Sequence, residues 1–192
     1  MANADVPNGL KPVRTLTGSP YNGATRRAVH AAGDSVELFV GDLVKLTGAG
    51  DATDNLPVVA QAAAGNSVCG VVVGIEPDYS DLEKHYVVAS TRRIVHVAMD
   101  PNLIFEVQED STGGSIAVAS IGLNTNVVVG SGSTTTGASA MELDSSDVAT
   151  DTSGQLKLLQ LAQREDNTLG DNASWEVMIA EHQLRDTVGT DV

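Results

Sequence analysis

The sequence predicts an all-β fold: an antiparallel β-barrel or sandwich (jelly-roll-like) with an extended N-terminal arm and at most one short helix. Apolar and polar residues alternate in several short segments, as they do in half-buried strands. Glycine, proline, asparagine and aspartate separate these segments at short intervals, which is typical of a barrel or sandwich. Only residues 115–121 have the spacing of a helix.

Residues 1–27 are predicted to form the extended arm. Three prolines in this segment lack the amide hydrogen that a strand ladder needs, and no apolar period is sustained. Ordering a chain costs about 1–2 kcal/mol per residue in backbone entropy, so we expect the arm to be ordered only on a partner. Its candidate partner contacts are Leu10, Lys11, Val13, Arg14, Leu16, Tyr21, Arg26 and Arg27.

Short segments with strand-like patterns follow the arm. They are Ser35–Val40, Leu43–Thr47, Leu56–Ala62, Ser67–Ile75, Arg93–Met99, Leu103–Gln108, Asn126–Val129, Ser139–Leu143, Leu156–Leu161 and Trp175–His182. Pro57 predicts an edge strand, because proline cannot donate to a ladder. Gly70 and Gly74 predict a bulge or the curved wall of a barrel. Leu156–Leu161 is apolar on nearly both faces and is predicted to be central, and Trp175 is predicted to lie in the core.

The stretch His85–Asp110 is predicted to be a β-hairpin near the centre of the fold. Leu103, Phe105 and Val107 alternate with polar or smaller residues and form one apolar row. Asp100–Asn102, with proline in its middle, suits a type I turn between the two strands.

The rest of the chain completes a single β domain. Ser115–Ile121 is predicted to be one short helix, because Ser115 can cap it and Gly122 can end it. The predicted organisation is an arm over residues 1–27, one β domain over 28–186 and a C-terminal tail over 187–192.

Composition and charge limit the classes of partner. The chain of 192 residues carries a formal net charge of −14, which disfavours direct binding to nucleic acid or to an anionic membrane. The arm is basic while the body is acidic, so we expect the arm to meet an acidic protein surface, including that of a neighbouring copy. No signal peptide or membrane-spanning run is recognisable, and we expect synthesis in the cytoplasm.

No motif in the sequence predicts catalysis, a cofactor or a metal site. The run GSGSTTTG lacks the ending of a phosphate-binding loop, and no nucleophile elbow is present. Cys69 lies in an apolar run and is predicted to be buried and inert. The four histidines do not have metal-ligand spacing, and aromatic residues make up only 3% of the chain, too few for a sugar-binding platform. We therefore expect a protein that is not an enzyme.

Several segments, in their order along the chain, resemble a known family. They are NGLKPVRTLTGSPYNGA, GDLVKLTG, VCGVVVGI, DPNLIFEVQED, SIGLNTNVVVGSGSTTTGASAMELDSS and DNASWEVMIAEHQ. Together they resemble the capsid cement (decoration) proteins of tailed double-stranded DNA bacteriophages, which are encoded near the major capsid protein. Each segment is a packing or turn pattern, and their order over nearly the whole chain gives the resemblance its value.

The resemblance implies a virion structural protein made in the host cytoplasm and located on the outer surface of the capsid. Its partner would be the major capsid protein, whose subunits it would cement against internal DNA pressure. The resemblance also implies a homo-oligomer, with a dimer slightly favoured over a trimer. The alternatives are another non-catalytic phage β module, such as a tail or fibre component, or a cellular binding domain.

Overall fold

The computed structural model describes residues 3–149 and 154–185, and these confirm the all-β fold class. A single 3-10 turn, η1, covers Val118–Ser120. The strands are β1 Lys11–Thr15, β2 Arg26–His30, β3 Leu43–Asp51, β4 Leu56–Gln61, β5 Gly70–Ile75, β6 Arg93–Ala98, β7 Leu103–Gln108, β8 Asn124–Thr125, β9 Val127–Val128, β10 Glu142–Leu143, β11 Leu156–Leu161 and β12 Ser174–Ile179.

Five strands close into a barrel in the order β2-β4-β3-β5-β6. Every neighbouring pair in it is antiparallel except β2 and β4, which run parallel. Alternate residues point inward and fill the barrel with small apolar side chains, including Val44, Val59, Cys69, Val95 and Val97. The predicted burial of Cys69 is thereby confirmed, and burial raises the pKa of its thiol to about 12.

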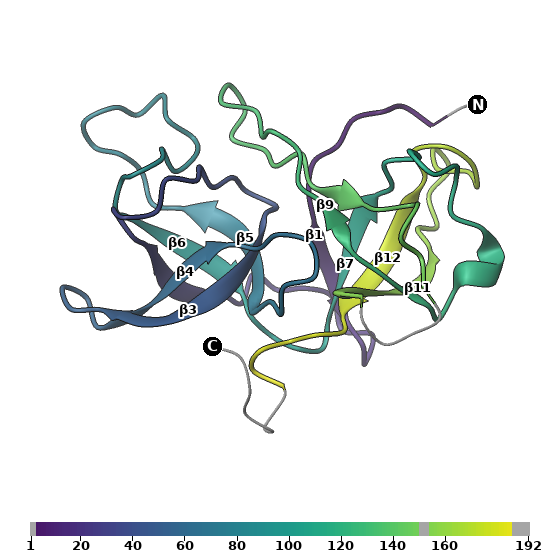
Figure 1. The fold of residues 1–192 in the computed structure, drawn as a ribbon, viewed down its shortest axis with the longest axis horizontal. Helices are drawn as coiled ribbons and strands as arrows, with labels where there is room; N and C mark the ends of the chain where they lie inside the picture. Colours follow the sequence, from purple (N-terminus) through teal and green to yellow (C-terminus); the bar gives the residue numbers. More distant parts are fainter. Residues whose placement is uncertain (1–2, 150–153, 186–192) are drawn as a thin grey trace.

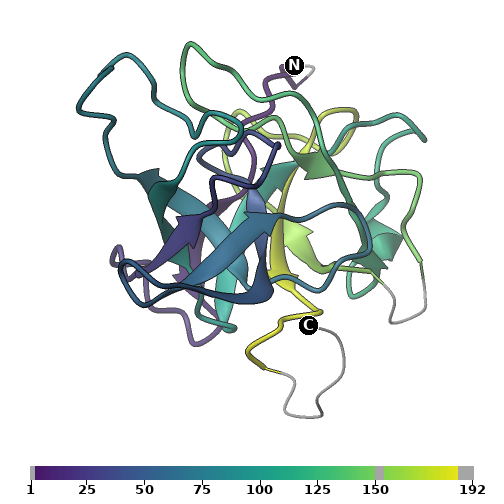
Figure 2. The ribbon, with the colours of Figure 1, turned by 60° about the vertical axis from the view of Figure 1, so that its left-hand side comes forward.

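A second sheet has the order β1-β7-β12-β11-β8 and is antiparallel throughout. The short ribbon of β9 and β10 lies beside it, and Figure 1 shows the barrel and this sheet side by side. One apolar core joins them, because Leu43 and Val71 of the barrel pack in the same cluster as Phe105 and Trp175 of the sheet. Figure 2 shows the same two parts from another side, with the 76–91 loop projecting from the barrel.

The predicted hairpin over 85–110 is wrong in its pairing, although both strands and the turn exist. β6 pairs with β2 and β5, whereas β7 pairs with β1 and β12. The turn is closed by the Leu103 amide, which donates to the Asp100 carbonyl at 3.1 Å. A type I turn splays the strands it joins, whereas two-residue hairpins favour the mirror-image turns. This turn therefore leads the chain out of the barrel and into the sheet.

The predicted arm is also corrected, because residues 11–15 and 26–30 are strands of the body. β1 is an edge strand of the sheet, with a bulge between Pro12 and Arg14 that accommodates the proline. β2 closes the barrel between β4 and β6, so the expected boundary between residues 27 and 28 falls inside a strand.

Three smaller expectations also change. Residues 35–40 form only isolated bridges, at Leu38 and Val40. β4 is paired on both sides and is not an edge, because its contacts with β2 begin at Val58, beyond Pro57. The expected helix is the single turn η1, whose N-cap is Ala117 and whose cap has no side-chain hydrogen bond. The predicted tail, 187–192, lies outside the described residues.

Candidate interaction surface

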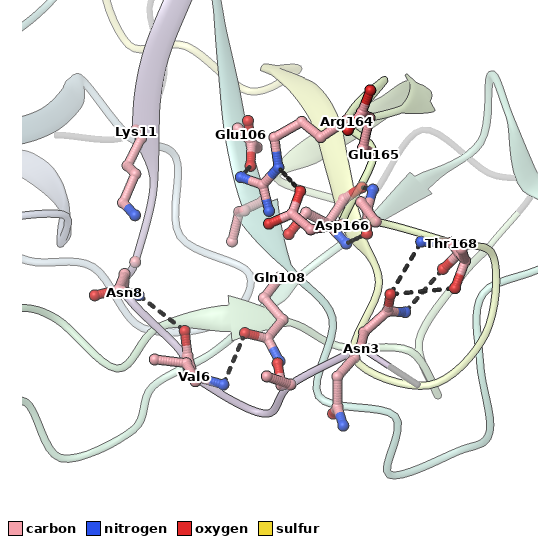
Figure 3. Close-up of a pocket in the computed structure, with 16 residues that line it drawn as sticks. Asn3, Val6, Asn8, Lys11, Glu106, Gln108, Arg164, Glu165, Asp166 and Thr168 are labelled. Carbon is pink, nitrogen blue, oxygen red and sulfur yellow. Dashed lines mark hydrogen bonds and ion pairs between the residues drawn. The ribbon is translucent and has the colours of Figure 1, made fainter. Parts of the chain in front are cut away.

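The first described residues are fastened to the body by amide side chains. The Asn3 side-chain amide donates to the carbonyls of Thr168 (2.8 Å) and Asp171 (2.9 Å). Gln108 on β7 donates to the Ala4 carbonyl at 3.2 Å and accepts from the Val6 amide at 3.2 Å. Figure 3 shows how these side chains bridge the two segments. Residues 3–8 are thus held by their own chain.

A close crossing fixes the next residues. The Leu10 amide donates to the Gly41 carbonyl at 2.9 Å, and the Leu10 side chain is 1% exposed in the shared core. Gly9 has a φ of +64°, and a Cβ there would lie 2.5 Å from the Gly41 oxygen. Only glycine fits such an approach without strain. The expectation that Leu10 contacts a partner is therefore corrected: it is a core residue.

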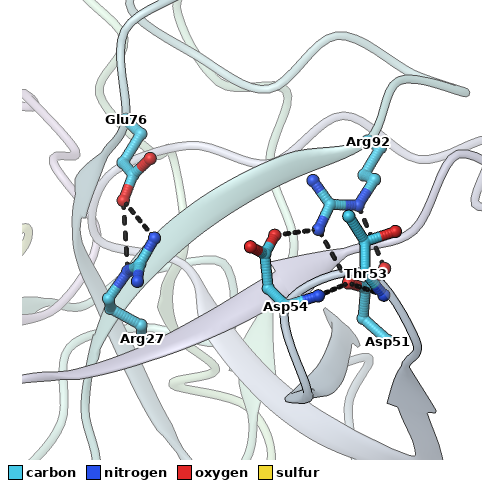
Figure 4. Close-up of polar contacts among 6 residues, drawn as sticks. All are labelled: Arg27, Asp51, Thr53, Asp54, Glu76 and Arg92. Atoms are coloured by element: carbon cyan, nitrogen blue, oxygen red, sulfur yellow. Dashed lines mark hydrogen bonds and ion pairs between the residues drawn. The ribbon is translucent and has the colours of Figure 1, made fainter.

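Two of the predicted basic contacts bind carboxylates of the same chain. Arg14 on β1 pairs with Glu176 on β12, whose side chain is 7% exposed. Arg27 on β2 pairs with Glu76 at 3.1 Å, as Figure 4 shows. The basic residues were expected to bind an acidic surface of another protein. Arg14 and Arg27 instead bind carboxylates of their own chain.

The remaining predicted contacts differ in exposure. Val13 and Tyr21 are half-buried, and Tyr21 packs against the shared core, where burial raises the pKa of its phenol. Four of the predicted contacts are exposed: Lys11, Leu16, Arg26 and Arg27, of which Arg27 is the one paired with Glu76. The Leu16 side chain is 55% exposed.

A polar groove of about 430 Å³ lies between the N-terminal segment, β7 and the 164–174 loop. Lys11 and Arg164 line it together with amide side chains, and Arg164 pairs with Glu106 and with Asp166 (Figure 3). The groove therefore presents paired charges and amide side chains.

Leu16 belongs to a surface that we call the turn face, made of residues 15–20, 100–102 and 182–185. The Leu16 amide donates to the Asn102 carbonyl at 2.8 Å, and the charge of Asp100 acts on the His182 ring. Leu184 is 46% exposed there, next to exposed Arg185. The turn face thus combines the exposed apolar side chains of Leu16 and Leu184 with one exposed arginine, Arg185, and one exposed carboxylate, Asp100.

Sequence reasoning missed a second exposed apolar surface at the other end of the barrel. Tyr79 is 90% exposed and Leu82 is 68% exposed, both in the loop after β5. The sequence identified this segment only as an acidic loop, and the available signal was one tyrosine and one leucine among carboxylates.

Ion pairs hold the loops at this end of the barrel. Arg92 binds both Asp51, at 2.7 Å, and Asp54 on the β3–β4 turn (Figure 4). The hydrogen bond from Arg92 lowers the pKa of Asp51 to about 2. Arg93, whose side chain is 9% exposed, pairs with Asp78 at 2.5 Å. The ion pair between Arg93 and Asp78 therefore fixes the start of the loop that carries Tyr79.

Among residues 3–149 and 154–185, no cluster of three or more histidine, cysteine, aspartate or glutamate side chains is placed to hold a metal ion. In the same part of the chain, no helix has the length and apolarity required to cross a membrane.

The whole chain was compared with known proteins. No protein-family model matches the chain, and no significant match is found among curated proteins or among solved structures.

Proposed function

We propose that this protein is a non-enzymatic virion structural protein that binds the outer surface of a capsid and cements subunits of the major capsid protein. The proposal begins from the family resemblance of the sequence segments. One structural observation supports it most: large apolar side chains are exposed beyond both ends of β6.

Strand β6 separates the two exposed surfaces. Its first residue, Arg93, pairs with Asp78 at the base of the Tyr79 loop, and its last residue, Ala98, leads into the turn face. Six residues of strand span roughly 20 Å. Exposed apolar groups on a rigid scaffold mark interaction sites, and two such sites at opposite ends suit a protein that joins two neighbouring subunits.

Cosedimentation with capsids tests the proposal. Purified protein is mixed with expanded, undecorated heads assembled from the major capsid protein encoded beside it. We expect saturable binding to the heads and a higher temperature of head disruption when the protein is bound. Failure of the full-length protein to sediment with the heads, at micromolar concentration and low salt, would remove this function.

We also propose that the protein acts as a homo-oligomer, a dimer slightly ahead of a trimer. The edge strand that the sequence predicted at residues 56–62 would have needed a covering partner, but β4 is paired on both sides and gives no such support. The family resemblance is the remaining support. Sedimentation equilibrium at micromolar concentration, with and without heads, measures the mass; a monomer under both conditions would contradict the proposal.

A further inference from the structure

The loop between β5 and β6 is anchored at both of its bases. On the first side, Asp78 accepts hydrogen bonds from the backbone amide of Ser80, at 3.0 Å, and from its hydroxyl, and it pairs with the largely buried Arg93. On the second side, the ring of Tyr86 stacks on Phe39 with centroids 5.2 Å apart. Val87 and Leu38 exchange backbone hydrogen bonds of 2.8 and 3.1 Å.

Residues 79–85 project between these anchors, and we call them the finger. An internal turn shapes it: the Lys84 amide donates to the Asp81 carbonyl at 3.3 Å, and the two side chains form an ion pair at 3.4 Å. Figures 1 and 2 both show the loop standing away from the barrel. The two bases fix the positions at which the finger leaves and rejoins the body.

The finger carries the two most exposed large apolar side chains among the described residues, Tyr79 and Leu82. Tyrosine offers a large contact area with few rotatable bonds and is enriched at interaction hot spots. A rigid base limits the entropy that is lost when such a side chain enters a pocket.

The charges around the finger define the chemistry of its partner. The finger and the 31–37 loop together contain four carboxylates and one lysine, Lys84, which pairs with Asp81; the carboxylates are Asp34, Glu37, Asp81 and Glu83. The 31–37 loop lies beside the second base of the β5–β6 loop, where the Ser90 amide donates to the Asp34 carbonyl at 2.7 Å. An acidic rim favours a basic partner surface and disfavours contact with the equally acidic finger of a second copy.

We propose that the finger is a docking element that inserts Tyr79 and Leu82 into an apolar pocket with a basic rim on a capsid subunit. This inference rests on the proposed function and names the part of the molecule that makes one of its two contacts. The exposed side chains supply the affinity, and the surrounding carboxylates supply orientation and speed of association.

A pair of matched variants tests the finger. The double variant Tyr79→Ser with Leu82→Ser removes both apolar side chains from it. The control, Val118→Ser with Ile121→Ser, removes two exposed apolar side chains from the η1 segment, at 55% and 43% exposure. Cosedimentation with heads is measured for both and for the unaltered protein. We expect the finger variant to bind at least tenfold more weakly and the control to bind within twofold of the unaltered protein.

Nitration of tyrosine gives a second measurement on the unaltered protein. Tyr79 is far more exposed than Tyr21 or Tyr86, so tetranitromethane should modify it first in free protein. On heads, its nitration should slow at least fivefold. Raising the salt concentration from 0.05 to 0.5 M should weaken binding several-fold, because the carboxylates of the rim are at least partly exposed to solvent and salt screens them.

The outcomes separate this inference from the proposed function. If the unaltered protein does not bind heads, the proposed function is overturned, and so is the proposed contact between the finger and the capsid. If the unaltered protein binds but the finger variant binds equally well, or Tyr79 on heads is nitrated as fast as in solution, the finger alone is overturned. An equal loss of head binding in the control variant would also overturn the finger, since binding would then depend on the total exposed apolar area and not on the finger.

Discussion

Glu109 shows how one buried carboxylate can order three neighbouring segments. Its side chain is fully buried and accepts hydrogen bonds from the Trp175 indole at 3.0 Å and from the Ile116 amide at 2.9 Å. Burial raises the pKa of Glu109, and these bonds oppose the rise. Trp175 is buried as the sequence predicted, and its polar edge finds the partner that a buried indole requires.

Phe105 tests the apolar core at the level of one side chain. It is fully buried in the cluster shared by the barrel and the sheet. We expect Phe105→Ala to lower the free energy of unfolding by about 3–5 kcal/mol, through lost transfer energy and a cavity. Urea unfolding measures this, with Val118→Ala as an exposed control. A loss below about 1 kcal/mol would contradict the burial.

Glu142 is expected to make stability depend on pH. Burial, with smaller contributions from Asp5 and Asp110, raises its pKa from 4.5 to about 7. The folded state therefore holds the proton more tightly than the unfolded state, and the stability contribution present at low pH is lost as the pH rises from about 4.5 to 7.

Glu142→Gln should then raise the free energy of unfolding at pH 8 by about 1–2 kcal/mol, a value reduced to allow for the partial exposure of the side chain. At pH 4.5 the substitution should change the free energy of unfolding little. Urea unfolding of both proteins at the two pH values measures the difference. His182, whose pKa burial lowers to about 4, contributes equally to both proteins, so the comparison removes it. An equal effect at both pH values would refute the titration.

At the scale of elements, the sequence located strands better than their partners. Alternation alone placed 103–108 and 156–161 with the bounds that the structure has. β1 was missed because proline and basic residues hide its pattern, and the bulge that accommodates Pro12 depends on pairing with β7. Partner choice follows from turn geometry and from distant strands, which periodicity does not encode. The finger was missed because exposure depends on the anchors at Arg93 and Phe39.

The Gly9–Gly41 crossing is an element-scale contact that mutation can test. Gly9→Ala combines left-handed backbone strain with a clash against the Gly41 oxygen, and we expect a loss of about 2–5 kcal/mol in unfolding free energy. Gly18→Ala is the matched control, since Gly18 has a φ of +91° but no atom near its would-be Cβ. We expect about 1–2 kcal/mol there. Equal losses in thermal or urea unfolding would show that the crossing is not tight.

At the scale of the whole molecule, residues 3–30 belong to both halves of the structure. Leu10 enters the shared core, β1 covers one edge of β7, and β2 closes the barrel. The sequence predicted an arm separate from a β domain over residues 28–186, whereas these contacts make the N-terminal segment part of the folded body.

Deleting residues 2–24 should leave a chain that does not unfold cooperatively near the temperature of the full protein. Loss of a buried leucine alone costs about 2–5 kcal/mol, a large share of the 5–15 kcal/mol typical of a domain. Calorimetry of the truncated protein measures this, beside Leu10→Ala and its exposed control Leu16→Ala. If the truncated protein melts within a few degrees of the full chain, the body folds without the N-terminal segment, and the prediction of a separate arm would be correct.

The central place of β12 has a consequence for synthesis on the ribosome. All barrel strands lie between residues 26 and 98, whereas β7 has β12 as one of its two neighbours. At bacterial translation rates, β12 emerges on the order of several seconds after β7. During that interval one edge of β7 and the apolar face around Phe105 lack their cover, so the nascent chain is most vulnerable to aggregation after its barrel can already form.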